Sequence, residues 1–142
     1  MTHVHRHALV RHSAERMYAL VNDVAAYPAR FAWCESADIL EQSPEHMVAR
    51  LGVRLGALRT AFTTRNTLSE PLRIRLELVD GPFRSLTGLW EFHALDEDAC
   101  KVSLTMDFEA SNRLIGSALS LGFKTLADRM VDDFRRAADA EA

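Results

Sequence analysis

Two adjoining stretches decide the fold: CKVSLTMDF (residues 100–108) and RLIGSALSLGFKTLADRMVDDF (residues 113–134). In the first, apolar residues at every second position alternate with polar ones, which is typical of a strand with one buried face. In the second, apolar residues recur every three or four positions: Ile115, Leu119, Phe123, Leu126, Met130, Phe134 and, just beyond it, Ala137. This spacing predicts an amphipathic helix of about 26 residues, about 39 Å long and capped by Ser111 or Asn112, that can cover a sheet face.

The alternation with a period of two extends back from Glu109 to Trp33. It is clear in MVARLGVRL (residues 47–55), LRIRLEL (residues 72–78) and LTGLWEFH (residues 86–93). Turn-forming residues separate these runs at Ser43-Pro44, Leu55-Gly56, Glu70-Pro71, Asp80-Gly81-Pro82 and Asp96-Glu97-Asp98. We therefore expect about six antiparallel strands in this region.

The N-terminal part predicts one more strand and one or two short helices. Residues 4–10 are expected to form the strand, and Ser13 is expected to cap a helix that has Glu15 in its first turn. The dipeptide Tyr27-Pro28 should interrupt this helix, because a residue before proline avoids the helical region. A second short helix is expected around residues 29–31.

The order of these elements predicts a single α+β domain over residues 1–142, with a curved antiparallel sheet of about seven strands wrapped around the long C-terminal helix. A sheet around a helix leaves room for an apolar pocket, although an ordinary packed core would use the same residues. The predicted pocket residues share an inward position: Tyr18, Leu51, Val53, Phe62, Leu76, Leu78, Phe83, Leu86, Trp90, Met106, Leu119, Phe123 and Met130.

Composition excludes several classes of protein. The net charge of −3 argues against a uniformly basic nucleic-acid binder. No apolar run reaches the roughly 20 residues of a membrane-spanning helix, and no signal peptide is evident. The two cysteines, Cys34 and Cys100, form no disulfide framework. We expect a cytoplasmic protein with reduced thiols.

The positions of the ionisable residues argue against catalysis, since an enzyme needs titratable groups that converge in its cavity. The ionisable residues Glu91, His93, Asp107 and Glu109 alternate away from the apolar face. The inward polar candidates are Thr60, Thr64, Tyr18 and Asn22, which can hydrogen-bond a carbonyl but are poor bases. We predict no catalytic residue, although a cyclase or dehydratase using the same cavity is the alternative.

Two further motifs have ordinary interpretations. His3, His5 and His7 would share one strand face at a metal-ligand spacing, but an exposed polar face explains them and we predict no metal site. Residues 114–123 carry no charge, and small residues recur four apart at Gly116 and Ser120. This segment is either a buried helix start or a contact with a ligand, a partner or a membrane surface.

Arginine is concentrated in one part of the chain. Residues 50–75 contain six arginines and one acid, whereas residues 91–109 contain six acids and one lysine. The six arginines lie on polar strand positions that could contact RNA phosphates: Arg50, Arg54, Arg59, Arg65, Arg73 and Arg75. A solvated sheet face is the alternative explanation. We expect the acidic region to face away from the arginines.

Several motifs together resemble one known family. They are SAERMYALVNDVAAYP (residues 13–28), FTTRN (residues 62–66), LVDGPF (residues 78–83), the Gly88-x-Trp90-x-Phe92 strand and the closing helix. Their order resembles the coenzyme Q-binding and ribosome-association-toxin branch of the START-like (polyketide cyclase/dehydrase, helix-grip) superfamily, and the ribosome association toxins most closely. The sequence departs from this family at FAWC (residues 31–34), which lacks a second proline, and at Ala110 after the last strand.

The resemblance implies a helix-grip fold, a lipophilic pocket and a function in binding rather than catalysis. It implies two partners. One is a polyprenyl quinone of the ubiquinone type, bound as a ligand in support of respiration, with no other cofactor. The other is the large ribosomal subunit, whose binding would block subunit association and translation. Peripheral contact with a membrane is a further expectation.

Overall fold

The computed structural model describes residues 1–111 and 116–141 and contains one antiparallel sheet of seven strands. In chain order the elements are β1 (Thr2–Val10), α1 (Ala14–Asn22), the 3-10 turn η1 (Val24–Ala26), α2 (Tyr27–Arg30), β2 (Cys34–Gln42), β3 (His46–Leu55), β4 (Leu58–Ser69), β5 (Arg73–Asp80), β6 (Phe83–Asp96), β7 (Ala99–Ala110) and α3 (Gly116–Glu141). The predicted α+β helix-grip architecture is confirmed.

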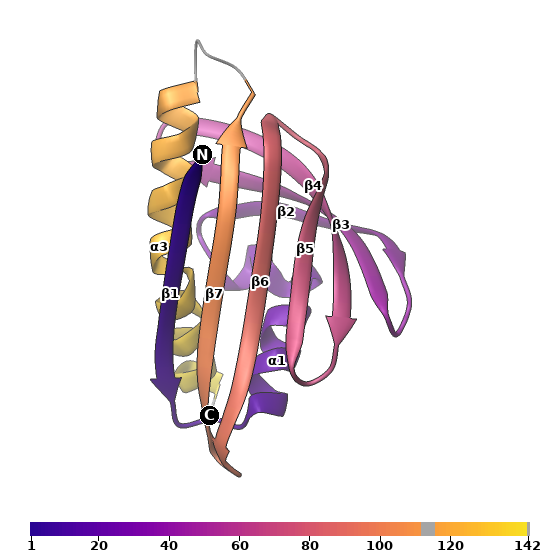
Figure 1. The fold of residues 1–142 in the computed structure, drawn as a ribbon, viewed down its shortest axis with the longest axis vertical. Coiled ribbons are helices and arrows are strands. Elements are labelled where there is room, and N and C mark those ends of the chain that lie inside the picture. Colours follow the sequence, from indigo (N-terminus) through magenta and orange to yellow (C-terminus); the bar gives the residue numbers. More distant parts are fainter. Residues whose placement is uncertain (112–115, 142) are drawn as a thin grey trace.

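The strand order β1-β7-β6-β5-β4-β3-β2 follows the chain except at β1, which pairs with the last strand. The hairpins from β2 to β7 are therefore local, whereas the pairing of β1 with β7 and the contact of α3 with β1 join segments far apart in the sequence. Figure 1 shows α3 running alongside β1 and β7, with α1 on the same side behind β6 and β5. The sheet curves so that β2, β3 and β4 cross over α3 near its start, at the end away from α1.

The short helices start and end for local reasons. Ser13 caps α1, since its Oγ accepts a hydrogen bond from the backbone N–H of Arg16 at 3.1 Å. The second helix begins at Tyr27 rather than Ala29, because proline fits the first turn of a helix, where its missing N–H costs nothing. Asn112, Leu114 and Ile115, which the sequence analysis placed at the start of α3, lie outside the described residues.

The core lies between the inner face of the sheet and the buried stripe of α3, which consists of Leu119, Phe123, Leu126, Ala127, Val131, Phe134 and Ala138. Aromatic side chains form two clusters within it. One joins Phe62, Phe83, Phe108 and Phe123 near the start of α3. The other joins Tyr27, Phe31, Trp33, Trp90 and Phe134.

Several strands also expose a large apolar side chain: Leu9 of β1, Leu40 of β2, Val79 of β5 and Leu95 of β6. Cys34 and Cys100 are buried and free on the inner side. None of the described helices combines the length and the apolar character that a membrane crossing requires.

Candidate functional site

An apolar cavity of about 60 Å³ lies between the sheet, α1 and α3. Both aromatic clusters contribute to its wall, since Phe62 and Phe123 come from one and Tyr27, Trp33 and Trp90 from the other. The cavity therefore lies in the space that the two clusters leave between them. Its remaining wall residues are Val21, Asn22, Val24, Ala49, Leu51, Val53, Thr64, Asn66, Ile74, Leu76, Met106, Leu126 and Met130.

Eight of the predicted pocket residues line this cavity: Leu51, Val53, Phe62, Leu76, Trp90, Met106, Phe123 and Met130. The six strand residues come from β3 to β7 and were predicted from the alternation with a period of two, whereas Phe123 and Met130 were predicted from the helical spacing of α3. Met106 and Met130 bring unbranched side chains to the wall, which adapt readily to differently shaped neighbours.

The other five predicted pocket residues do not line it: Tyr18, Leu78, Phe83, Leu86 and Leu119. Tyr18 instead packs edge-on against Phe92, with ring centroids 5.6 Å apart. Phe83 belongs to the first aromatic cluster, where it contacts Phe108 and Phe123. Leu86 and Leu119 are fully buried, and Leu78 is half-buried beside Thr64 on the next strand. Leu78, Phe83 and Leu86 share the inward strand parity, and Tyr18 and Leu119 are buried on helices, but none of these five side chains borders the cavity.

The sequence analysis missed several wall residues. Ala49 and Ile74 have the same parity as their named strand neighbours, and Asn66 has the parity of Phe62 and Thr64, so the alternation would have found them. Tyr27 and Trp33 follow α1 in irregular or short elements, where no periodicity exists to reveal their orientation.

The polar groups on the wall are few. The Thr64 hydroxyl donates to Asn66 Oδ1 at 2.8 Å, so these two β4 side chains satisfy each other. The Tyr27 hydroxyl donates to the Val21 carbonyl, and burial raises the pKa of this phenol far above its usual range. Asn22 also lines the cavity, and its Oδ1 is buried with no hydrogen-bond partner among the described residues.

None of the described wall residues carries a carboxylate, imidazole, thiol or amine. As predicted from the alternation, Glu91 and His93 are exposed on the outside of the sheet, and Asp107 and Glu109 are half-buried there. Of the inward polar candidates, Thr64 and Asn22 reach the cavity, whereas Thr60 and Tyr18 do not. The wall is therefore apolar with a few hydrogen-bonding groups, and among its described residues it offers no ordinary general base.

An outer groove adjoins the cavity between α3 and the turn that joins β3 and β4. Trp33 and Leu126 line both spaces, so these two side chains lie between the cavity and the groove. The groove also includes Gly122, where an added Cβ would lie 2.9 Å from Leu55 Cβ. Glycine at this position thus allows α3 to approach the β3 backbone closely.

The six predicted RNA-contact arginines all lie exposed on the outer face of β3, β4 and β5. The expectation that the acidic region of residues 91–109 faces away from them is wrong at Glu91. Strand pairing places Asp38 opposite Arg50, Glu77 opposite Arg65 and Glu91 opposite Arg73. Glu35 forms ion pairs with Arg54 at 3.7 Å and with Arg59 at 3.4 Å. Carboxylates from neighbouring strands therefore offset much of the charge that the sequence count suggested.

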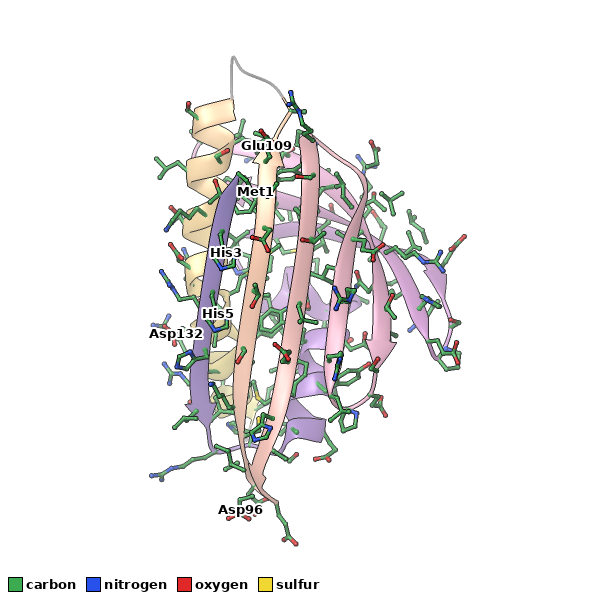
Figure 2. All side chains as sticks on the ribbon, viewed as in Figure 1. Met1, His3, His5, Asp96, Glu109 and Asp132 are labelled. Atoms are coloured by element: carbon green, nitrogen blue, oxygen red, sulfur yellow. The ribbon has the colours of Figure 1, made fainter. Side chains whose placement is uncertain are left out.

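The histidines of β1 contact their neighbours on β7. His3 Nδ1 lies 2.6 Å from Asp107 Oδ1, and His5 Nδ1 lies 2.8 Å from Thr105 Oγ1. Figure 2 shows His3 and His5 on the outer side of the strand, with Glu109 farther along β7. Among the described residues, no three histidine, cysteine or acidic side chains are grouped as metal ligands would be.

Residues 10–135, which include the cavity and most of α3, match the family described as polyketide cyclase/dehydrase and lipid transport. The chain belongs to this family. The ribosome association toxin RatA of Vibrio cholerae is 46% identical over 138 residues, which cover 97% of this chain and 96% of that protein. The mitochondrial coenzyme Q-binding protein COQ10 of Drosophila melanogaster is 28% identical over 89% of this chain and 54% of that protein.

Among solved structures, the ZhuI aromatase/cyclase from Streptomyces sp. R1128 superimposes with a TM-score of 0.84 at 21% identity, covering 97% of this chain and 93% of that one. At this level of identity the likeness shows the fold alone. The family resemblance that the motifs predicted is confirmed.

Proposed function

We propose that this protein associates with the ribosome, binding the large subunit in the cytoplasm and blocking subunit association without catalysing a reaction. The observation that supports this most is its 46% identity to a ribosome association toxin across nearly the full length of both chains. The matched region spans the strands that carry the outer sheet face as well as the core.

The outer face of β3 to β5 is the proposed contact surface for ribosomal RNA. Within the described residues, Arg50, Arg65, Arg73 and Arg75 form no ion pair and can turn toward phosphates. Arg75 has Thr67 and Leu89 as its cross-strand neighbours, so no acid lies directly opposite it. Guanidinium groups bind phosphate oxygens with paired hydrogen bonds, which makes these side chains suitable for RNA.

The test is co-sedimentation of the purified protein with large subunits over a range of salt concentrations. Changing Arg65→Glu and Arg75→Glu together should weaken binding and reduce its salt dependence, since phosphate contacts release counterions. The control variant, Arg11→Glu with Arg136→Glu, has the same net charge but alters the loop after β1 and α3 instead. Equal binding by the two variants, both folded, would refute the proposed surface.

The cavity supports a second candidate function, the binding of a lipophilic ligand such as an isoprenoid quinone. Its wall is apolar apart from Asn22, Thr64, Asn66 and the polar tips of the aromatic side chains, and COQ10 is named for coenzyme Q binding. A volume of about 60 Å³ is well below the roughly 300–1,000 Å³ of drug-sized ligand pockets. Ligand entry must therefore displace wall residues, and Met130, which is half-buried on α3, is placed to move.

Mass spectrometry of an organic extract of the purified protein tests this second function directly. Saturable quenching of Trp90 fluorescence by quinones of graded tail length should accompany it. Met130→Trp should abolish the binding by filling the cavity, whereas the matched variant Met130→Leu should retain it. Absence of saturable quenching by the folded wild type at every tail length would remove this function. A cyclase or dehydratase would instead be indicated by turnover that Asn22→Ala abolishes.

A further inference from the structure

The outer groove between α3 and the β3–β4 turn is larger than the cavity and continuous with its wall. It has a volume of about 350 Å³, against about 60 Å³ for the cavity. Apart from Thr125 and two arginines, its described lining residues are apolar, and they include the exposed side chain of Leu121. Trp33 and Leu126 line both spaces. An apolar chain that passes between these two side chains would therefore occupy the groove and the cavity together.

The charged residues that line the groove are both arginines. Arg54 lies near the end of β3 and Arg129 lies on α3, so each side of the groove contributes one. Their side chains are 49% and 58% exposed, which leaves both guanidinium groups accessible. Within the part of the chain that the structure describes, no acid lines the groove.

The acids beside these arginines are each shared with a second arginine. Glu35 lies 3.7 Å from Arg54 and 3.4 Å from an arginine of β4. Asp133 lies 3.4 Å from Arg129 and 3.8 Å from another arginine of α3. Asp133 also accepts a hydrogen bond from the Trp33 indole N–H at 3.1 Å. One carboxylate thus serves two guanidinium groups on each side, and the groove keeps a surplus of positive charge.

We infer that the groove binds the anionic head of a lipid whose apolar chain extends into the cavity. This inference rests on the proposed ligand-binding function, extends its site to the groove and narrows its ligand class. A carboxylate or a phosphate monoester at the end of the chain carries the charge that Arg54 and Arg129 complement. A quinone head is neutral and gains less from these two side chains.

Three probes of one chain length test this inference: decanoate, decyl phosphate and the neutral ester methyl decanoate. Equilibrium dialysis against the full-length protein, below the micellar concentration of each probe, gives the dissociation constants. The wild type should bind decanoate about fivefold more tightly than the ester, the gain expected from two half-exposed ion pairs. Added salt should reduce this preference, because it screens exposed charges. Tighter binding of decyl phosphate than of decanoate would identify a phosphate head, and the reverse order a carboxylate.

A pair of variants locates the anion. Arg54→Gln with Arg129→Gln should abolish the preference for decanoate, while methyl decanoate still binds. The control, Arg11→Gln with Arg84→Gln, removes the same charge at exposed positions that line neither the groove nor the cavity, and it should retain the preference.

The outcomes separate this inference from the ligand-binding function itself. Equal affinity of the wild type for decanoate and its ester would overturn the inference while leaving lipophile binding in place. A preference that survives in the Arg54 and Arg129 variant would overturn it as well, since the anion would then bind elsewhere. Failure of the folded wild type to bind any of the three probes would remove both proposals. The comparison within the wild type is decisive even if a variant does not fold.

Discussion

Two changes from a polar to an apolar residue on the cavity wall should have opposite effects on stability. Asn22→Leu removes an amide oxygen that is buried without a partner, whereas Thr64→Val removes a hydroxyl that donates to Asn66 at 2.8 Å. Leucine also has the higher helix propensity, which adds a few tenths of a kcal/mol at this position in α1.

The magnitudes follow from the hydrogen-bonding states. Relief of an unpaired buried acceptor should stabilise Asn22→Leu by about 1–3 kcal/mol. Loss of the Thr64 hydroxyl leaves Asn66, which is 5% exposed, without that donor and should cost a comparable amount, about 1–3 kcal/mol. For a domain of this size each kcal/mol shifts the melting temperature by about 3 °C, so the two variants should differ by about 6 to 18 °C.

Thermal unfolding followed by circular dichroism, with urea unfolding at a fixed temperature as a second measurement, checks both signs. An Asn22→Leu variant that is less stable than the wild type would show that this amide is satisfied in solution and would refute the predicted sign. Destabilisation of both variants by similar amounts would mean that any polar group on this wall is needed for folding.

The remaining predictions concern packing, thiols and aromatic contacts. Gly122→Ala should destabilise the protein by about 1–2 kcal/mol despite the better helix propensity of alanine, because the new Cβ lies 2.9 Å from Leu55 Cβ; in a double-mutant cycle with Leu55→Gly, which removes that Cβ, the coupling should recover most of this loss, and full additivity of the two changes would contradict it. Burial raises the pKa of Cys100 to about 11, with Glu15 adding to the effect, so the unfolded thiol ionises first. The contribution of the protonated Cys100 thiol to the free energy of unfolding should be complete below about pH 8.5 and be lost as the pH rises toward 11. The free energy of unfolding of Cys100→Ala should therefore fall less over this pH range, and identical pH profiles of variant and wild type would contradict the prediction. Phe123→Ala should cost about 3–5 kcal/mol, since the ring packs on Phe62, Phe83 and Phe108, and a loss below about 1 kcal/mol in urea unfolding would show that the cluster is loosely packed.

Much of the fold was determined by the sequence alone. Alternation with a period of two identified six strands from β2 to β7, and the stripe at steps of three and four identified α3. Ser13 marked the start of α1 because its side chain replaces the hydrogen-bond partner that the first turn of a helix lacks. These features are local, so the identity of residues a few positions apart is sufficient to predict them.

The composition of the site was decided by the tertiary structure. The alternation along each strand predicted which side chains point inward. It could not separate Phe83 and Leu86, which pack away from the cavity, from Met106 and Trp90, which border it. That distinction depends on where the curvature of the sheet leaves a gap between two aromatic clusters. Each cluster joins residues more than 60 positions apart in the chain, such as Phe62 with Phe123 and Tyr27 with Phe134.

The charge of the outer sheet face and the hydrogen bonding of the cavity wall were also predicted only in part from the sequence. The sequence correctly predicted exposed arginines, but only strand pairing revealed that Asp38, Glu77 and Glu91 lie opposite three of them. Nothing in the residues around Asn22 indicates that its amide oxygen lacks a partner, because the partners that could satisfy it would come from β4 and from the segment that contains Tyr27. An electrostatic field or an unpaired group is a property of neighbours in space, and those neighbours are chosen by the packing of the whole domain.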